Sequence, residues 1–220
     1  MPNWVYNSVG ITGPAKVIDK FVEVVGRPSY IYPQQEGEEY NRVFSYGAFI
    51  LPPKNKVEEY HAPNGSGPDG PYGDTEYNWY NWNVANWGVK WDAGNVDMND
   101  ITSELQASKG TKALYLAWDS PWSIPEPGLA KMIEKWPKLT FDGRSEEEQG
   151  WGARWYGEDG QMSINYWDIP VSHAEYADRD TIDNPDGCIC SHYDDPNEWF
   201  GDCPDREEAI AEYEKENANV

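Results

Sequence analysis

The feature that most constrains the fold is a tryptophan-rich stretch, residues 79–92, which holds four of the twelve tryptophans in this 220-residue chain. Its apolar residues recur at i, i+4, i+7 and i+11, the spacing of one helical face. They are Tyr80, Val84, Trp87 and Trp91. A tryptophan side chain buries about 200 Å² when it packs into a core. The spacing therefore predicts a helix that packs against a large surface.

Polar residues form a second row beside this stripe, and they leave two interpretations open. The row consists of Asn83, Asn86 and Lys90, and Asp92 follows it. In one interpretation the tryptophans are core residues whose indole N–H groups bond to neighbouring carbonyls. In the other, the rings hold polar groups at a groove. The ligand-binding candidates for such a groove are Asn86, Lys90, Asp92 and, at the end of another aromatic segment, Asp119.

The remaining segments alternate between strand and helix patterns. Period-two alternation predicts strands, periods near 3.6 predict helices, and Gly and Pro mark the connections. In chain order these patterns predict a strand at 4–11, a helix at 14–25, a strand at 43–50, a long loop at 61–76, a strand or short helix at 97–108, a strand at 111–118, a helix at 123–136, a strand from 139 and a hairpin of 150–156 and 161–167. A four-residue turn, 157–160, is expected to join the two arms of the hairpin.

Two strand–helix–strand units in series are typical of an α+β, ferredoxin-like fold, an antiparallel sheet with two helices on one face. We expect this domain to span residues 1–170, with a tryptophan-rich helical insert at 51–110 and the hairpin added to the sheet. Such a sheet leaves an edge strand free to pair, so a homodimer is an ordinary expectation. Residues 171–220 are predicted to form an acidic C-terminal extension.

The chain is strongly acidic, with 39 Asp and Glu against 17 Lys and Arg and a net charge of −22. Direct binding to nucleic acid needs basic groups that replace the counterions of the phosphates, so this composition argues against it. Residues 171–220 alone hold 15 acidic and 3 basic residues. The charge therefore predicts a partner protein with a basic face.

Membrane and export signals are not expected in this chain. No stretch approaches the roughly 20 apolar residues of a membrane-spanning helix. The N-terminus, Met1-Pro2-Asn3-Trp4, lacks the basic segment and apolar run of a signal peptide. We therefore expect no membrane association and a cytoplasmic location.

Four segments of the sequence carry a resemblance to a known family. They are Pro2–Asn7, Phe44–Pro52, Trp79–Asp92 and Ala117–Trp122, the third containing the cluster Asn-Trp-Gly-x-Lys-Trp-Asp. Over roughly residues 2–168 the chain resembles the YubB-like family of proteins, which phages and conjugative plasmids encode. The resemblance implies a ferredoxin-like fold and a mobile element in a bacterial host. It implies no reaction and no catalytic residues.

Zinc is the one cofactor for which the sequence offers candidate ligands. Four residues near the C-terminus offer enough ligands for a structural zinc site, namely Cys188, Cys190, His192 and Cys203. Their spacing argues against it, because a Cys-x-Cys pair replaces the usual Cys-x-x-Cys and no second pair follows. Zinc stays an alternative to three ordinary thiols, and we expect no other cofactor.

The sequence lacks motifs for enzymatic chemistry. Its three histidines, His61, His173 and His192, stand outside any catalytic context, and neither a Gly-x-Ser-x-Gly elbow nor a phosphate-binding Gly-x-x-x-x-Gly-Lys loop occurs. Asp92 and Asp119 would suit a glycosidase pair, but carboxylates are too abundant here for the pair to be specific. We therefore favour a non-enzymatic protein over an enzyme.

Clustered carboxylates suggest how such a protein would act. The partner-binding candidates are Glu146, Glu147, Glu148, Asp205, Glu207, Glu208 and Glu212, the last four on a predicted helix at 204–217. Such runs are ordinarily solvated faces, but spaced carboxylates also imitate the phosphates of nucleic acid. We expect a phage or plasmid accessory protein that inhibits a host defence or nucleic-acid-binding protein through its acidic surface. The alternative is an enzyme or small-ligand-binding protein with a pocket beside the tryptophan-rich helix.

Overall fold

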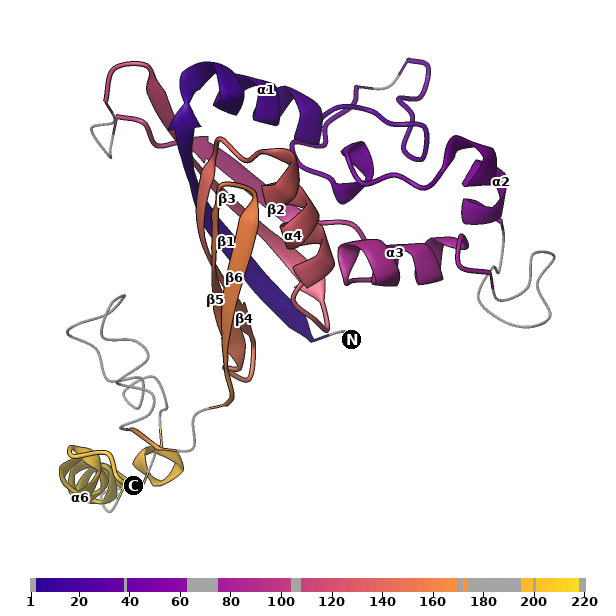
Figure 1. The fold of residues 1–220 in the computed structure, drawn as a ribbon. Coiled ribbons are helices and arrows are strands. Elements are labelled where there is room, and N and C mark those ends of the chain that lie inside the picture. The colour runs from indigo at the N-terminus through magenta and orange to yellow at the C-terminus, as the bar shows by residue number, and fades with distance from the viewer. Residues whose placement is uncertain are drawn as a thin grey trace. The chain divides into compact units, whose positions relative to one another are not determined.

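The computed structural model describes residues 3–37, 39–62, 75–103, 108–169, 172–173, 195–199 and 201–217. Its contacts divide the chain into two units, Met1–Trp167 and Asp168–Val220. The colours of Figure 1 follow the chain through both units. The division falls close to residue 170, where the sequence predicts the domain boundary.

The first unit combines one sheet with helices and turns. Its strands are β1 (Trp4–Pro14), β2 (Gly94–Asp100), β3 (Thr111–Pro121), β4 (Thr140–Glu147), β5 (Gly152–Glu158) and β6 (Gln161–Trp167). Its helices are α1 (Ala15–Val25), α2 (Val57–Tyr60), α3 (Trp79–Trp87) and α4 (Glu126–Lys135), with short 3₁₀ turns η1 (Tyr46–Ala48) and η2 (Lys54–Lys56). The strand order is β2-β3-β1-β4-β5-β6, and every neighbouring pair is antiparallel.

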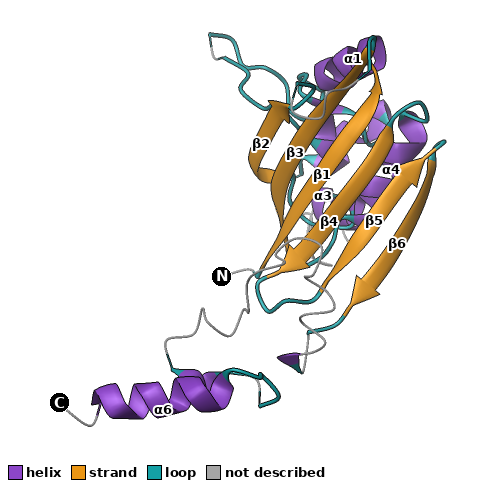
Figure 2. Ribbon diagram, turned by 90° about the vertical axis from the view of Figure 1, so that its left-hand side faces the viewer, coloured by secondary structure: helices purple, strands orange, loops and turns teal. Residues whose placement is uncertain are grey.

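One face of this sheet carries the core, because successive side chains of a strand point to opposite faces. Every second residue of β1 from Val5 to Ile11 is buried, and β3 buries Leu114, Leu116 and Trp118. Figure 2 shows α1, α3 and α4 together behind the sheet. These helices contribute buried residues to the same cluster, among them Phe21, Trp87, Leu129, Met132 and Ile133. The sheet and its helices therefore form two layers around one core.

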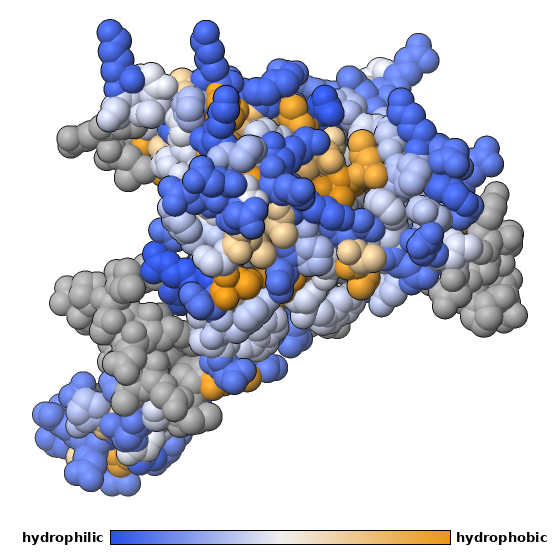
Figure 3. Space-filling model, viewed as in Figure 1, coloured by the Kyte–Doolittle hydropathy of each residue, from blue (hydrophilic) through white to orange (hydrophobic). Residues whose placement is uncertain are grey.

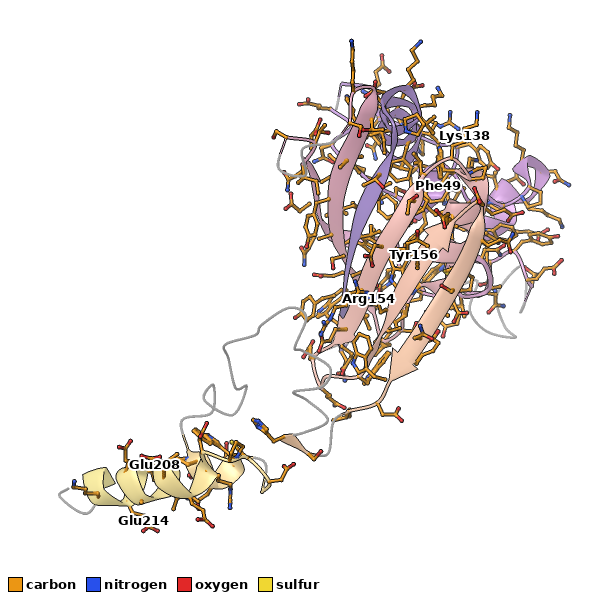
Figure 4. All side chains as sticks on the ribbon, turned by 60° about the vertical axis from the view of Figure 1, so that its left-hand side comes forward. Phe49, Lys138, Arg154, Tyr156, Glu208 and Glu214 are labelled. Atoms are coloured by element: carbon orange, nitrogen blue, oxygen red, sulfur yellow. The ribbon has the colours of Figure 1, made fainter. Side chains whose placement is uncertain are left out.

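The opposite face of the sheet carries polar and aromatic side chains. Tyr6, Tyr115 and Tyr156 are exposed there, on three different strands. Arg154 and Tyr156, at alternate positions of β5, project from this face in Figure 4. Of the described elements of the first unit, none packs on it (Figure 2). In the view of Figure 3, hydrophilic residues cover most of the surface and apolar ones form separate patches, as expected for so charged a chain.

The predicted strand at 43–50 is wrong. Its centre is the turn η1, and the Ile50 N–H donates to the Tyr46 carbonyl at 2.8 Å, a helical rather than a ladder bond. All residues from Phe44 to Ile50 are buried. A short apolar run buried on every side has the same pattern in a strand, a turn or a helix, so periodicity alone misassigned it.

The second strand in chain order is β2, which lies inside the range predicted as an insert, 51–110. The predicted element at 97–108 covers only the second half of this strand, and residues 104–107 lie outside the described residues. β2 is an edge strand with a bulge between Gly94 and Asp97, and its Asn and Asp residues disfavour strands. The described residues between α1 and β2, 26–37, 39–62 and 75–93, therefore lie outside the sheet.

The tryptophan-rich helix, α3, is shorter than predicted and buries a different face. It ends at Gly88, whose φ of 84° is left-handed and whose Cβ, if present, would lie 2.6 Å from Pro127 Cδ. Of the predicted apolar stripe only Trp87 is buried, whereas three residues are exposed, namely Tyr80, Val84 and Trp91. Asn83, from the predicted polar row, is buried with its amide hydrogen-bonded.

The predicted hairpin of β5 and β6 is confirmed, but its turn is tighter than predicted. Glu158 pairs with Gln161, so only Asp159 and Gly160 form the loop. Both residues have positive φ, 50° and 77°, as a two-residue type I′ turn requires. The Asp-Gly pair matches the right-handed twist of the two strands.

The second unit contains the turn η4 (Pro196–Glu198) and the helix α6 (Arg206–Asn217) among its described residues. Asp195 caps η4 by accepting from the Asn197 N–H at 2.9 Å. Cys203 is buried, and Asp202 accepts from the His173 N–H at 2.7 Å. Across both units, no described helix combines the length and the apolar composition needed to cross a membrane.

Candidate ligand pocket

A cavity of about 790 Å³ lies beside α3 in the first unit. Its walls come from residues 41–44, 60–62 and 90–93, with Tyr32, Trp79, Asn83 and Val96. Small-ligand sites measure about 300–1,000 Å³ and combine apolar walls with a few placed polar groups. The size and the mixed lining of this cavity are those of a ligand site.

Asp92 ties the two sides of the pocket together. Its side chain is 7% exposed, and Oδ2 accepts from Arg42 Nη1 at 3.0 Å and from Ser45 Oγ at 2.5 Å. Oδ1 accepts from the backbone N–H groups of Tyr46 at 2.8 Å and Ala93 at 2.9 Å. Burial raises the pKa of Asp92, and these bonds together with the Arg42 charge offset part of the rise. Three of these four bonds join loop 42–46 to the turn after α3, and the fourth, from Ala93, lies within that turn.

Arg42 is held in place on two sides. One N–H group bonds to Asp92, and the guanidinium carbon lies 4.4 Å from the centroid of the Tyr32 ring. Stacking on an aromatic face fixes the plane of a guanidinium, whose five N–H donors form a rigid fork. The side chain is 41% exposed, so its outer edge is accessible from the pocket.

A hydrogen-bonded chain of side chains supports the far wall. The Tyr60 hydroxyl donates to Asn83 Oδ1 at 2.9 Å, and Asn83 Nδ2 donates to the Lys90 carbonyl at 2.9 Å. The hydroxyls of Tyr32 and Tyr60 are hydrogen-bonded to each other, and burial raises the pKa of both. The His61 ring packs edge-on against Tyr60 at 5.1 Å. This network fixes the aromatic rings that line the cavity.

Lys90 lies between two indole rings at the edge of the pocket. Its Nζ is 4.0 Å from the Trp91 centroid and 3.8 Å from the Trp122 centroid, which places it in cation–π contact with both. Trp4 extends the aromatic group, 6.4 Å from Trp91. Trp122 has a φ of 61°, a conformation rare for bulky residues. Within the described residues Lys90 forms no salt bridge.

The structure brings together two of the four predicted ligand-binding residues. Lys90 and Asp92 both line the pocket. Asn86 lies elsewhere, where its Oδ1 accepts from Lys131 Nζ at 2.5 Å. Asp119 belongs to β3 and accepts from Asn95 at 2.6 Å. The polar row beside the tryptophans therefore splits, because the helix ends before Lys90.

The predicted partner-binding carboxylates differ in exposure. Glu147 is 2% exposed and faces the core of the first unit, so its inclusion in a contact surface is wrong. It occupies an inward position of β4 opposite Val5. Glu146 pairs with Arg144 at 2.7 Å, and Glu148 accepts from the Trp4 N–H at 2.9 Å.

In the second unit all four predicted carboxylates are exposed, namely Asp205, Glu207, Glu208 and Glu212. Glu208 and Glu214 project from the α6 ribbon in Figure 4. Only one basic residue stands in the last turn of α6, Lys215. This helix therefore presents an acidic surface.

Of the four zinc-ligand candidates, Cys188, Cys190 and His192 lie outside the described residues. Cys203 is described and buried. Among the described residues, no group of three or more His, Cys, Asp or Glu is placed to hold a metal ion. The zinc alternative stays a prediction.

Several pocket residues have no motif in the sequence. Arg42, Tyr32 and His61 come from segments far from the tryptophan-rich stretch. Arg42 precedes the buried run that was misassigned as a strand, and a basic residue beside such a run was the available signal. Asn83 belongs to the predicted polar row, and an asparagine on an otherwise aromatic helix is also a sign of a buried polar network.

Comparisons with known proteins give one structural likeness. No family model matches the chain, and no curated protein matches it. The crystal structure of the protein Api92 from Yersinia pseudotuberculosis, described with the family model DUF1281, resembles this chain with a TM-score of 0.48 and 10% identity. The likeness covers 77% of this chain and 99% of that chain.

Proposed function

We propose that the first unit is a small-ligand-binding domain and that the pocket beside α3 is its binding site. The observation that carries the proposal is the arrangement of Arg42, Lys90 and Asp92 around a cavity of about 790 Å³ with aromatic walls. Ligand sites use a few fixed polar groups for orientation and apolar surface for affinity. No catalytic role is part of the proposal.

The cavity distinguishes this cluster from a structural ion pair. An ion pair that serves only stability gains little from a solvent-exposed member, because exposed charges contribute little to stability. Here Asp92 is nearly fully buried, whereas its partner Arg42 is 41% exposed at the pocket. The buried half of the pair positions the exposed half.

Filling the pocket tests the proposal. Val43 lines the cavity and is 47% exposed, so Val43→Trp places an indole in the cavity at little cost to the core. Val22 on α1 is 37% exposed and lies outside the pocket, so Val22→Trp is the matched control. A metabolite library is screened by thermal shift against the unmodified protein and both variants. We expect ligands that stabilise the unmodified protein and Val22→Trp but not Val43→Trp. A library without such a compound contradicts the proposal.

A second function is supported by the acidic helix α6. We propose that the chain is a phage or plasmid accessory protein, in the cytoplasm of a bacterial host, that inhibits a basic host protein through these carboxylates. The supporting observation is that Asp205, Glu207, Glu208 and Glu212 are all exposed on or beside one helix.

A pull-down from host lysate, eluted with a salt gradient, tests this second function. Charges on exposed groups are screened within about 8 Å at physiological salt, so a charge-driven complex dissociates as salt rises. Glu207→Lys combined with Glu208→Lys should abolish capture. The control Glu58→Lys, an exposed acid on α2, should retain it. Capture that survives the double reversal contradicts the role of α6.

We also propose that the sheet and helices form a ferredoxin-like fold with an added hairpin. Supporting it, β1, α1 and β2 form one strand–helix–strand unit and β3, α4 and β4 a second, with the strands in the order β2-β3-β1-β4. This arrangement and the four sequence motifs also support a relationship to the YubB-like family. An experimental structure in which β2 paired with a strand other than β3 would contradict the fold.

A further inference from the structure

We infer that the ligand of the pocket is an organic anion with a planar ring, of the class of nucleoside monophosphates. The inference rests on the proposed ligand-binding function of the pocket. It goes further by naming the chemistry that Arg42, Lys90 and the aromatic walls recognise.

The first argument is the local charge. Arg42 and Lys90 line the cavity against one carboxylate, Asp92, so the pocket carries an excess of one positive charge in a chain of net charge −22. Every acceptor position of Asp92 is already used by protein donors. A cationic ligand would find no carboxylate oxygen to bind there. An anion would meet two positive groups.

The second argument is the preorganisation of Arg42. Its guanidinium is tied to Asp92 through one N–H group and stacked on Tyr32 at 4.4 Å. The fork geometry of guanidinium donors matches the oxygens of a phosphate or carboxylate. A guanidinium already fixed in orientation loses little side-chain freedom when it binds an anion.

The third argument is the aromatic lining. Tyr32, Tyr60, Trp79 and Trp91 border the same cavity as the cations. Planar rings stack on such side chains, and every nucleobase can do so because each has a flat aromatic face. The Tyr60–Asn83 bond fixes one of these rings in place.

The fourth argument is size. One liquid water takes up about 30 Å³, so a cavity of about 790 Å³ exceeds the needs of an inorganic anion many times over. A ligand that occupies most of the cavity therefore has a body attached to its anionic group. A base and a ribose supply that body in a nucleoside monophosphate.

The test separates the two halves of the ligand by isothermal titration calorimetry. The titrants are AMP, GMP, CMP and UMP, with adenosine as the ring without the anion and inorganic phosphate as the anion without the ring. We expect at least one nucleotide to bind at least tenfold more tightly than either half. Lys90→Gln should weaken nucleotide binding about tenfold and leave adenosine binding unchanged.

Two further variants keep the result interpretable. Arg42→Lys keeps the charge and loses the fork, so nucleotide binding should weaken while the melting temperature stays within a few degrees. Lys135→Gln is the matched control, because Lys135 also lies over an indole, 5.8 Å from the Trp136 centroid, but outside the pocket. It should bind nucleotides as the unmodified protein does.

The outcomes distinguish this inference from the proposed function. If the Val43→Trp screen yields only neutral or cationic ligands, the anion inference is overturned and the ligand-binding function stands. Inorganic phosphate that binds as tightly as every nucleotide overturns the role of the ring. If no compound of any charge class is sensitive to Val43→Trp, both proposals fall.

Discussion

Removal of the Asp92 carboxylate should be among the most destabilising single changes in the first unit. Asp92→Ala leaves two backbone N–H groups, of Tyr46 and Ala93, and the Ser45 hydroxyl without their acceptor. A buried donor left unpaired costs about 1–3 kcal/mol, and breaking a buried ion pair about 3–5 kcal/mol. Because Arg42 is partly exposed and recovers contact with water, we expect a loss of about 4 kcal/mol.

The conservative change tests hydrogen bonding at the second carboxylate oxygen. Asp92→Asn keeps one oxygen for the two backbone N–H groups and replaces Oδ2, which accepts from Arg42 and Ser45, with an amide N–H donor. A buried donor left unpaired costs about 1–3 kcal/mol, so a loss of about 2 kcal/mol is expected. Urea unfolding monitored by tryptophan fluorescence measures the loss of unfolding free energy in both variants. With an m-value of about 2 kcal/mol/M, Asp92→Ala should lower the midpoint by about 2 M.

Asp119→Ala is the matched control, because this carboxylate bonds only an exposed asparagine in the described structure, Asn95. Its effect should stay within about 0.5 kcal/mol, the usual range for surface positions. If Asp92→Ala and Asp119→Ala shifted the midpoint equally, Asp92 would not be the tie between the two sides of the pocket.

Three more predictions follow from named contacts. Burial raises the pKa of Asp92, so in the native state Asp92 keeps its proton at a pH where the unfolded chain has lost it. The stability of the unmodified protein relative to Asp92→Asn should therefore be greatest below about pH 4 and should fall as the pH rises through the raised pKa. Urea unfolding at a series of pH values measures this difference. Gly88→Ala should cost about 1–2 kcal/mol or more, because φ is 84° and the new Cβ would meet Pro127. Glu147→Gln should leave stability unchanged or raise it by about 1 kcal/mol, because Oε1 is buried without a described hydrogen-bond partner.

Each of these predictions has a result that opposes it. A difference between the unmodified protein and Asp92→Asn that grows with pH would mean a lowered pKa. Gly10→Ala, whose Cβ would come no closer than 3.9 Å to a neighbour, is the control for Gly88→Ala and should cost less. Destabilisation of more than about 1 kcal/mol by Glu147→Gln would reveal a charged partner for Glu147.

The elements that follow a period were predicted well. β1, α1, β3 and α4 occupy the predicted ranges within a few residues, because each has one buried face and one exposed face. The segment around Tyr46 was wrongly predicted as a strand, since burial on all sides removes the alternation that distinguishes a strand from a turn. Only the second half of β2 was predicted, because its Asn and Asp residues disfavour strands and the strand forms through pairing with β3.

The candidate site shows the same division. Lys90 and Asp92 were predicted because they follow the tryptophans closely, and α3 with its Gly88 turn places them at one pocket. Arg42 was not predicted, because its role depends on a bond across 50 positions of the chain to Asp92. A contact of that sequence separation leaves no periodic trace in a single sequence.

The acidity of the chain and the positive pocket are compatible because screening acts at short range. At 0.15 M salt the Debye length is about 8 Å, so distant carboxylates contribute little at the pocket while Arg42 and Lys90 act at contact distance. Partly buried charge pairs are screened much less than exposed ones, so the affinity of the pocket for an anion should change little with ionic strength. The carboxylates of α6 are exposed, so the affinity for a basic protein held by them should fall steeply as salt rises. The dependence of affinity on salt concentration therefore distinguishes the two proposed partners: a weak dependence indicates an anion in the pocket, and a steep one indicates a basic protein bound to α6.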